Sequence, residues 1–378
     1  MTFRYFDVLS ENSDIRIIFH IDFDYFFAQC EEIRNPSIKN FPVIVCVYSG
    51  RTSDSGVVST SNYVARKYGV KSGISIREAK SKLSSVNNPV FLPIDQKYYS
   101  EISNKAMNII KSVVDKCEIV GLDECYVELT EFLNGDFSKA VEIAQMLKTK
   151  LYEKIHISCS IGISYNKLLA KIGSKYQKPS GLFLMEPKKS INFISDLDIS
   201  LIPRIGPKNK KKLHEMGIKT FKDISIANTD MLKKEFGSAC SNYLCNSARG
   251  INYDPVKSDN NIKQIVRMKT LKENSHDVEY FKFELHKLCN SILEKLTQRN
   301  LLFKTLALIF ISETLEIKTK SRTLRIPSQD PHELFINAEI ILNDFISANQ
   351  DVHIRRLGIK VLDLKDKSGQ STLLNFIE

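Results

Sequence analysis

Two short acidic segments have the residue types and spacing of a metal-dependent active site. Asp22-Phe23-Asp24 follows the apolar run Ile17–Ile21, and Asp123-Glu124 follows the run Cys117–Leu122. Short runs rich in Ile, Val and Phe are typical of strands whose faces are largely covered. A carboxylate that is desolvated at the end of such a strand is costly unless a cation or a donor compensates it. We therefore expect both segments to end neighbouring strands and to share bound metal.

Carboxylate oxygens of this kind suit magnesium, which keeps waters and substrate phosphates as its other ligands. Two such ions about 4 Å apart can hold the attacking and the leaving oxygen of a phosphoryl displacement. Either acidic segment alone would more simply be a solvated turn. The metal site is indicated only by the two segments together with the residues between them.

Four segments along the chain carry further polar residues in a specific order. They are Asp22–Glu32, Ser59–Val70, Gly121–Glu128 and Gly162–Gly181. The first resembles the first catalytic motif of the Y-family, lesion-bypass DNA polymerases, and the second resembles their fingers motif. The third is similar to their second acidic motif, and the fourth to the end of their palm. The similarity runs from about residue 16 to the C-terminus and is closest to the archaeal DNA polymerase IV (DinB-like) branch of the family.

This resemblance implies an α+β multidomain fold of the right-hand polymerase type, with a palm, fingers, a helical thumb and a little finger. It implies template-directed addition of a deoxynucleotide from a dNTP to the 3′-hydroxyl of a primer, with low-fidelity synthesis past lesions in DNA damage tolerance. The implied cofactor is two Mg²⁺ ions per active site, and the implied partners are primer–template DNA and dNTP. No part of the 378 residues is left over for a proofreading exonuclease, so we expect fidelity to rest on base pairing and pocket shape.

The resemblance also implies which residues hold the metal. Asp22 and Asp123 are expected to bridge the two ions, and Glu124 to hold the ion that activates the primer hydroxyl. The carbonyl of Phe23 is the expected additional ligand. Asp24 is expected to be a structural or supporting acid, because the family motif does not make it a ligand.

The incoming triphosphate is expected at three side chains that match the family motifs, namely Tyr63, Arg66 and Lys178. A guanidinium fork and an ammonium group are chemically suited to phosphate, although each is also a common surface residue. Backbone N–H groups near Tyr25 and Phe26, at the start of a predicted helix, can face phosphate oxygens as well.

Phe27 stands where the family places its steric gate, a flat ring that leaves room for hydrogen but not for a hydroxyl at C2′ of the sugar. An ordinary core Phe is the alternative. Val57 and Ser59 occupy positions over the nascent base pair where family members often carry Ala. A fuller roof would limit which bulky lesions fit.

The composition agrees with this class without requiring it. With 43% hydrophobic and 26% charged residues, the chain is typical of globular proteins and is long enough for two or three cores. Its excess of ten positive charges favours a polyanionic partner, although a lysine-rich surface would give the same excess. Eight cysteines without a Cys-x-x-Cys pair argue against a zinc site or a disulfide framework.

No stretch approaches the ~20 apolar residues that span a membrane, so we expect no membrane partner. Residues 1–14 lack an apolar core and a small-residue cleavage site, unlike a secretory signal. We expect them to form an N-terminal extension, and the protein to be cytoplasmic and monomeric.

Alternating strands and helices are predicted up to residue 185. The apolar runs 42–48 and 158–163 are typical of strands, Ser75–Glu78 of a capping box that begins a helix, and 98–114 and 138–155 of helices. We expect the two acidic strands and strand 158–163 to be neighbours in one sheet that the two longer helices cover. The palm is then predicted over 15–26 and 92–185, with the fingers inserted over 27–91.

Residues 186–251 are predicted to be a thumb of short helices. Pro203–Gly206, followed by Lys208 and Lys210–Lys212, resembles a helix-hairpin-helix motif, whose turn offers backbone N–H groups to a phosphate. Arg204 replaces the usual first Gly of that turn. A basic helical hairpin on the surface is the alternative.

The polar stretch 252–263, which contains Pro255, is predicted to be a linker. Beyond it, strand 265–271, helix 278–299, strands 304–312 and 318–325, helix 331–348 and strand 354–363 give a βαββαβ order. One sheet backed by two helices fits this order and resembles the family's little finger, predicted over 264–364. We expect Lys318, Lys320, Arg322 and Arg325 to face a DNA backbone, with a lysine-protected edge strand as the alternative.

Residues 365–378 are predicted to be a flexible tail. Gln370, Leu373, Phe376 and Ile377 resemble the box through which replication proteins bind a ring-shaped, PCNA-type sliding clamp. One helical turn would place the apolar residues on a common face for docking in a groove. Ile377 stands where a second aromatic is usual. A tail that folds back on the little finger is the alternative.

Two other classes of protein share part of this pattern. A nucleotidyl cyclase would use two metals on a similar sheet but would need no basic thumb or little finger. A non-catalytic scaffold for DNA or clamp binding would be favoured by loss of Asp22, Asp123 or Glu124, and all three are present.

Overall fold

The computed structural model describes residues 15–258, 262–349 and 351–367. The predicted N-terminal extension and the predicted clamp-binding box, Gln370–Ile377, lie outside these residues. The described chain divides into two compact units, one made of residues 15–45, 59–72 and 82–258 and the other of the remainder. Within the described residues, no helix combines the length and apolar character needed to cross a membrane.

The palm sheet of the first unit has five strands in the order β5-β6-β1-β7-β8. They are β1 (Ile18–Phe23), β5 (Lys116–Ile119), β6 (Glu124–Glu128), β7 (Cys159–Ser164) and β8 (Leu182–Leu184). Strand β1 lies between β6 and β7 and is antiparallel to both, while β7 and β8 are parallel. β1 and β7 are thus neighbours in one sheet, as predicted, but the predicted strand 117–122 forms β5, which β6 separates from β1.

The second acidic segment begins a strand, so the prediction that it ends one is wrong. Strand β5 stops at Ile119, Asp123 lies in the turn of a hairpin, and Glu124 is the first residue of β6. Because β6 runs antiparallel to β1, the start of β6 meets the end of β1. Asp22 is consequently paired with Glu124.

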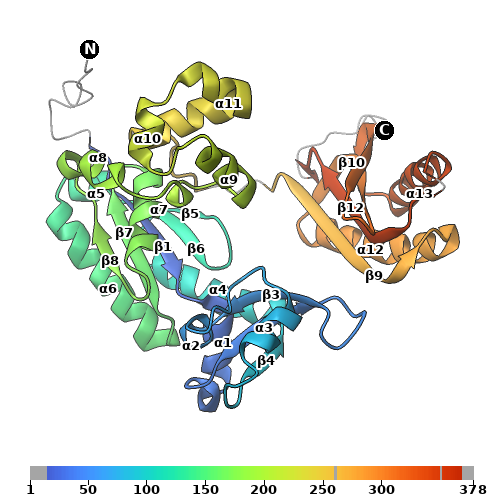
Figure 1. The fold of residues 1–378 in the computed structure, drawn as a ribbon, viewed down its shortest axis with the longest axis horizontal. Helices are drawn as coiled ribbons and strands as arrows, with labels where there is room; N and C mark the ends of the chain where they lie inside the picture. Colours follow the sequence, from blue (N-terminus) through green and yellow to red (C-terminus); the bar gives the residue numbers. More distant parts are fainter. Residues whose placement is uncertain (1–14, 259–261, 350, 368–378) are drawn as a thin grey trace, which may run out of the picture. The chain divides into compact units, whose positions relative to one another are not determined.

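Helices cover both faces of the palm sheet (Figure 1). Alternate residues of a strand point to opposite faces, and Phe19, Ile21 and Phe23 of β1 lie in the core with residues of α4 (Gln96–Lys111) and α6 (Phe137–Ile155). On the other face, β1 and β7 pack against α7 (Lys167–Tyr176). His20 and Asp22 belong to this second face.

The fingers contain a small sheet of order β3-β2-β4. The elements of this segment are α1 (Phe26–Arg34), η3 (Pro36–Ile38), β2 (Val43–Tyr48), β3 (Gly56–Ser61), α2 (Tyr63–Arg66), α3 (Ile76–Lys82) and β4 (Val90–Pro93). The N–H of Glu78 donates to Oγ of Ser75 at 3.1 Å, so the helix start predicted at Ser75 is confirmed. A short helix, α5 (Thr130–Leu133), follows the palm strand β6.

The thumb is helical, and its core also includes Leu168, Leu169 and Ile172 of the palm helix α7. The helices of the thumb are α8 (Pro187–Ser195), η4 (Ile199–Leu201), α9 (Pro207–Glu215), α10 (Phe221–Ile226) and α11 (Thr229–Ala248). Arg204, in the predicted hairpin turn, has φ of 67°. It therefore takes the left-handed conformation that the usual Gly of this turn would adopt without steric cost.

The described parts of the predicted linker, residues 252–258 and 262–263, form no helix or strand, and the first of them is anchored to the palm. The side chain of Val256 is only 3% exposed and packs with Ile18, Tyr126 and Ala170. The N–H of Lys257 donates to the Glu118 carboxylate at 2.8 Å. The polar composition of this stretch gave no indication of this anchor.

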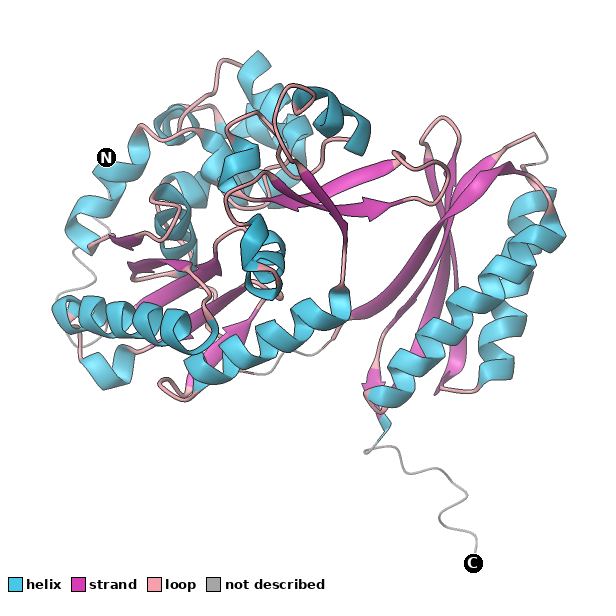
Figure 2. Ribbon diagram, turned by 90° about the horizontal axis from the view of Figure 1, so that it is seen from below, coloured by secondary structure: helices cyan, strands magenta, loops and turns pink. Residues whose placement is uncertain are grey.

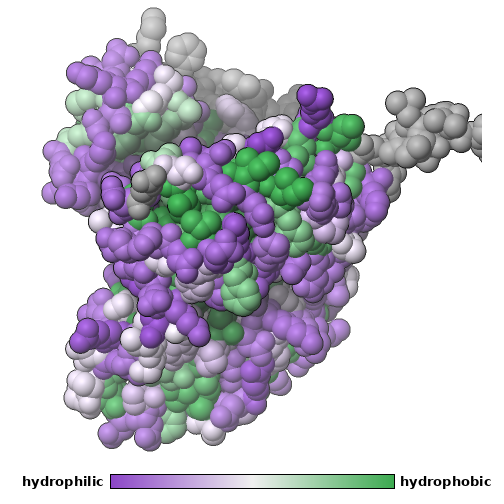
Figure 3. All heavy atoms as spheres, turned by 90° about the vertical axis from the view of Figure 1, so that its right-hand side faces the viewer, coloured by the Kyte–Doolittle hydropathy of each residue, from purple (hydrophilic) through white to green (hydrophobic). Residues whose placement is uncertain are grey.

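The C-terminal part of the second unit has the predicted βαββαβ order, with sheet order β11-β10-β12-β9. Its elements are β9 (Gln264–Ser275), α12 (Val278–Gln298), β10 (Leu301–Ser312), β11 (Ile317–Ser328), α13 (Pro331–Ser347), β12 (Ile354–Leu362) and β13 (Lys365–Asp366). Figure 2 shows α12 and α13 together on one face of the sheet. The face of the molecule drawn in Figure 3 is mostly hydrophilic, with separate apolar patches.

Three of the four basic residues of β11 share one face of the strand, and β11 is an edge strand of its sheet. That these residues face a DNA backbone stays a prediction. Lys318, Lys320 and Arg322 pair with residues of β10 that belong to the helix-covered core, namely Phe310, Leu308 and Leu306. Paired residues point to the same face, so these three side chains lie on the helix side. Lys318 Nζ accordingly donates to Oδ1 of Asn349 at 2.8 Å. Arg325 lies where the register of β11 shifts.

Candidate active site

A cavity of about 230 Å³ lies where β1 leads into α1. It brings together most of the residues predicted for catalysis and for dNTP binding. Its lining is Asp22, Phe23, Tyr25, Phe26, Phe27, Ser59, Thr60, Arg66, Ser72, Asp123 and Lys178. Glu124 and Tyr63, which were predicted with them, do not line the cavity.

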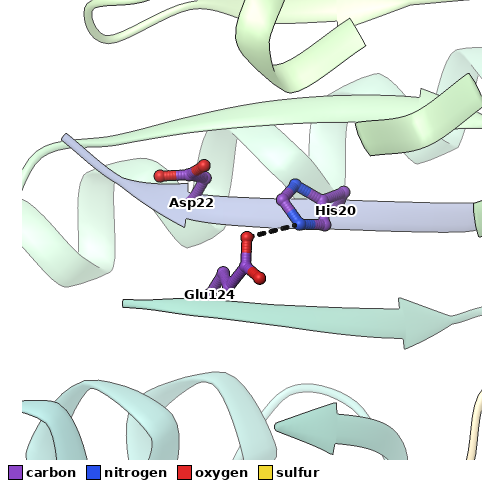
Figure 4. A group of neighbouring side chains, drawn as sticks. All are labelled: His20, Asp22 and Glu124. Atoms are coloured by element: carbon purple, nitrogen blue, oxygen red, sulfur yellow. Dashed lines mark ion pairs between the residues drawn. The ribbon is translucent and has the colours of Figure 1, made fainter. Parts of the chain in front are cut away.

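The carboxylates predicted as metal ligands come from the end of β1 and the start of β6. Asp22, which is 8% exposed, is paired with Glu124 across the two strands. The N–H of Phe23 donates to the carbonyl of Asp123 at 2.7 Å, which fixes the turn beside β1. Figure 4 shows Asp22 and Glu124 next to the ring of His20, and one ligand atom from each of the three lies within 4.8 Å of the other two.

Two lysines compensate this negative charge. Lys171 Nζ of α7 donates to Oε2 of Glu124 at 2.6 Å, and Lys178 pairs with Oδ1 of Asp22. Burial nevertheless raises the pKa of Asp22, and burial and the charge of Glu124 raise the pKa of Asp123. For Glu124, the His20 contact and Lys171 outweigh burial and lower the pKa to about 2.

The oxygen donors therefore fit a divalent cation. Burial raises the pKa of Asp22 and of Asp123 despite the neighbouring lysines, and the charge of Glu124 adds to the rise at Asp123. Additional positive charge would favour their ionised forms, and carboxylate oxygens at a site open to a cavity are the ligands that Mg²⁺ prefers.

Asp24 is fully buried and supports the turn that carries Lys178. Its carboxylate accepts hydrogen bonds from Oγ of Ser158 (2.9 Å), Oγ of Ser160 (2.7 Å) and the N–H of Ser180 (2.9 Å). On the other side of this turn, Lys148 Nζ donates to the carbonyl of Gly181 at 3.0 Å. These contacts support the structural role expected for Asp24.

The short helix α2 presents Tyr63 and Arg66. Asn62 caps it, since its Oδ1 accepts from the N–H of Ala65 at 3.0 Å, while its Nδ2 donates to Glu32 at 2.9 Å. The Arg66 guanidinium lies 4.8 Å from the centre of the Tyr63 ring. The Tyr63 hydroxyl is buried and has no hydrogen-bond partner among the described residues. Burial, then the charge of Asp24, raises its pKa to about 12, so it remains a donor at neutral pH.

Phe27 lines the cavity with its ring stacked on Tyr99, at a centroid distance of 4.7 Å and an interplanar angle of 16°. The Tyr99 hydroxyl donates to Glu31 at 2.7 Å, which fixes the supporting ring. Phe27 is thus held in one orientation at the cavity wall. This placement suits a steric gate, and the packing against Tyr99 also fits a core residue.

Sequence reasoning missed two residues that contact Glu124. His20 lies two residues before Asp22 on the same strand, so the period of two could have placed both on one face. Lys171 reaches Glu124 only through the packing of α7 on the sheet, for which the local pattern holds no signal. Thr60 and Ser72 of the cavity wall were missed as well.

Comparison with known proteins decides which polymerase-like family these residues belong to. Residues 21–175 match the model of the impB/mucB/samB family, and residues 262–373 match the model of its C-terminal domain. Residues 200–252 match the model described as the DNA polymerase-iota thumb domain. The chain is 44% identical to DNA polymerase IV of Nitrosopumilus maritimus over 96% of its own length and 100% of that protein. The chain belongs to the Y family of DNA polymerases.

Other relatives of this Y-family polymerase agree. DNA polymerase IV 1 of Methanosarcina mazei is 37% identical, over 96% of this chain and 99% of that protein. A solved Y-family DNA polymerase chimera of Dbh and Dpo4 matches with a TM-score of 0.86 and 34% identity, covering 93% of this chain and 99% of the other. DinB from Sulfolobus solfataricus matches with a TM-score of 0.64 and 33% identity, covering 92% and 98%.

This Y-family polymerase is therefore a DNA-directed DNA polymerase with the right-hand fold, and its partner is DNA. The predicted family, fold and translesion activity are confirmed. Membership also implies dependence on a divalent metal, which the donor set of Asp22, Asp123 and Glu124 fits. The scaffold and cyclase alternatives are not supported.

Proposed function

We propose that this polymerase adds dNMP to a primer at the site formed by Asp22, Asp123 and Glu124, which would hold two Mg²⁺ ions together with the carbonyl of Phe23. The register that pairs Asp22 with Glu124, beside a cavity that contains Arg66 and Lys178, is the observation that carries this proposal. When bound, the ions supply charge stabilisation for the attacking and leaving oxygens.

The cavity side of the site suits the triphosphate of the incoming nucleotide. Arg66 offers a planar fork of donors and Lys178 a compact ammonium group, and the Tyr63 hydroxyl has no hydrogen-bond partner within the described part of the chain. The first turn of α1, at Tyr25 and Phe26, adds backbone N–H groups at a helix N-terminus. Lys178 is paired with Asp22 in this structure, so we infer that it exchanges that carboxylate for a phosphate oxygen when the nucleotide binds.

Phe27 is the proposed steric gate against ribonucleotides. Its ring forms part of the cavity wall and is stacked on Tyr99, so it cannot turn away without losing that contact. A rigid ring at this place would exclude a 2′-hydroxyl by overlap rather than by a missing hydrogen bond.

The proposed partners extend beyond the active site. The turn Pro203–Gly206 and the lysines of α9 suit the backbone of primer–template DNA, because backbone N–H groups at a helix N-terminus favour phosphate. The tail residues Gln370, Leu373, Phe376 and Ile377 are proposed to bind a PCNA-type sliding clamp. We propose a monomer that acts on chromosomal DNA in the cytoplasm.

Primer extension tests the assignment of the acids. We expect Asp123→Asn to lose extension with Mg²⁺ and four dNTPs, while its affinity for primer–template DNA, measured by fluorescence anisotropy, stays within about twofold. Asp115→Asn, in the exposed segment just before β5, is the matched control and should extend normally. Extension by Asp123→Asn at the rate of the control would contradict the proposal.

A further inference from the structure

Lys148 is a half-buried lysine of α6 whose ammonium group binds the backbone beside two palm strands. Nζ lies 2.5 Å from the carbonyl oxygen of Ser180, 3.0 Å from that of Gly181 and 3.0 Å from that of Cys159. An ammonium group has three hydrogens to donate, so these carbonyls account for all of them. Hydrogen bonds from a charged donor are stronger than those between neutral groups. Lys148 is therefore a strong fastening for this part of the backbone.

The fold brings Lys148 to these carbonyls from the face of the palm sheet opposite Asp22. Helix α6 lies along β7 and β8 (Figure 1), and it buries Ala144, Leu147 and Leu151 in the core. Lys148, the residue after Leu147, lies beside this apolar stripe, so its long stem can follow the helix while the ammonium group reaches the start of β7. Lys148 does not line the active-site cavity. It borders a separate cavity of about 240 Å³ instead.

The segment Lys178–Gly181, which connects the end of α7 to the start of β8, borders both cavities. Lys178 lines the active-site cavity, and Ser180 lines the cavity beside α6. Among the described residues, the two linings have no member in common. The bond from Lys148 to the carbonyl of Ser180 therefore acts only two residues away from the side chain that is proposed to meet the triphosphate.

Ser180 has a backbone conformation that needs support. Its φ of 51° lies in the left-handed region, which is costly for a residue with a side chain. Its N–H donates to the carboxylate of Asp24 at 2.9 Å, and its carbonyl accepts from Lys148. The carbonyl of Gly181 has a second donor, the N–H of Ile161 at 3.0 Å, whereas within the described chain the carbonyl of Ser180 accepts from Lys148 alone. The two bonds to Asp24 and Lys148 thus fix the peptide groups on either side of the strained residue.

We propose that Lys148 is a positioning residue for the incoming nucleotide, because it holds the carbonyl of Ser180 and so keeps Lys178 directed into the active-site cavity. It acts together with Asp24, which holds the N–H of the same residue. Without Lys148, only one of the two bonds that fix Ser180 remains, and Lys178 can move away from the place where it would meet a phosphate oxygen. This inference rests on the proposed contact of Lys178 with the triphosphate.

The dependence of single-turnover nucleotide addition on dNTP concentration separates binding from chemistry. Lys148→Met keeps a long unbranched side chain but has no hydrogen to donate. Because displacing a positioning group by about 1 Å can cost up to about a hundredfold, we expect the apparent Kd for dNTP to rise about tenfold. The maximal rate and the affinity for primer–template DNA should stay within about twofold, since loss of binding that is equal in the ground state and the transition state leaves the maximal rate unchanged.

Further variants separate positioning from a general effect on the fold. Lys148→Arg retains charged donors and should recover part of the dNTP affinity. Lys154→Met makes the same change at an exposed lysine of the same helix and should bind dNTP as the wild type does. Circular dichroism checks that each variant is folded. If Lys148→Met does not fold, Lys148→Gln takes its place, because a glutamine amide has two N–H hydrogens and cannot donate to three carbonyls.

A double-mutant cycle with Lys178→Ala shows whether Lys148 acts through Lys178. Residues that act through one another have non-additive effects, so Lys148→Met should weaken dNTP binding by less than about twofold once Lys178 is absent. Additive losses, which a general effect on the fold would produce, would overturn the inference, as would wild-type dNTP affinity in Lys148→Met. Unchanged dNTP affinity in Lys178→Ala would overturn the proposed function of Lys178, and the inference with it.

Discussion

Asp22 and Glu124 face one another across strands β1 and β6, yet their partners belong to opposite sides of the site. Asp22 lines the cavity and pairs with Lys178, whereas Glu124 lies outside the cavity wall and contacts Lys171 and His20 of the palm interior. The two acids therefore divide the site. Asp22 adjoins the cavity proposed to hold the triphosphate, and Glu124 does not line that cavity.

Removing the ring of Phe27 should change the selectivity of the polymerase between deoxyribonucleotides and ribonucleotides. We expect Phe27→Ala to increase the use of ribonucleotides relative to deoxynucleotides by at least a hundredfold, where each factor of ten corresponds to ~1.4 kcal/mol of activation free energy. The reason is that the ring proposed to exclude a 2′-hydroxyl is gone. Single-nucleotide incorporation with matched rNTP and dNTP measures the ratio. Tyr99→Phe keeps the stacked ring and should leave the ratio unchanged. General loss of activity at a constant ratio would show that Phe27 is a core residue.

The thumb turn should gain stability when its left-handed residue becomes glycine. Arg204 has φ of 67°, and this conformation costs a residue with a side chain about 1 kcal/mol relative to Gly. We expect Arg204→Gly to unfold at higher denaturant concentration, measured by circular dichroism in urea. Arg204→Ala, which keeps the strain, serves as the control and should not be stabilised. A destabilised Arg204→Gly would show that the contact of Arg204 with the Tyr243 ring outweighs the strain.

Glu128, at the far end of β6, should make stability depend on acid pH. Burial raises its pKa, but hydrogen bonds from Arg16 and Lys116 outweigh burial and bring the pKa from 4.5 to about 2. A carboxyl whose folded pKa is lowered stabilises the fold above the unfolded pKa, and this contribution is lost as pH falls toward the folded pKa. Wild type should therefore exceed Glu128→Gln by about 2 kcal/mol in free energy of unfolding at neutral pH.

The difference between wild type and Glu128→Gln should shrink as pH falls from 4.5 to about 2. Parallel urea titrations of the two proteins measure it, and the other titrating acids cancel in the comparison. A difference that stays constant over this window would mean that Glu128 is not held ionised by Arg16 and Lys116.

Deleting residues 370–378 should remove stimulation by a ring-shaped sliding clamp while leaving distributive extension of short primers intact. The deletion removes Gln370 and the apolar Leu373, Phe376 and Ile377, whose spacing suits docking in a groove. Extension of a long template with and without the clamp measures the effect. Ser371→Ala, which leaves these four residues in place, is the control. Equal stimulation of the truncated and full-length proteins would exclude the tail as the tether.

Motifs and periodicity predicted the order of the elements, because each depends on local residues. The apolar run before Asp22 became β1, and Val278–Gln298 became α12 close to its predicted bounds. The placement of Glu124 at the start of β6 was not predicted, since a run of apolar residues does not show where a hairpin turns. Because β6 is antiparallel to β1, Asp22 and Glu124 still lie opposite one another, although the strand boundary was predicted wrongly.

Features that depend on tertiary packing could not be predicted from the sequence. Val256 is buried against Tyr126 although its neighbours are polar, and Lys318 lies on the helix side of β11 because of the register with Phe310. In the sequence, His20 is a single polar residue in an apolar strand. Its contact with Ser174 depends on the packing of α7 against the sheet. These contacts join segments that are distant in sequence, so a local pattern holds no record of them.

The rate of a single nucleotide addition by Glu124→Gln tests the central claim most directly, because the substitution removes one charge without changing the size of the side chain. Glu128→Gln, the same change on the same strand, is the control. Under single-turnover conditions with Mg²⁺, we predict that Glu124→Gln is slowed about a hundredfold or more, with primer–template affinity unchanged, while Glu128→Gln retains the wild-type rate. A wild-type rate in Glu124→Gln would contradict the account.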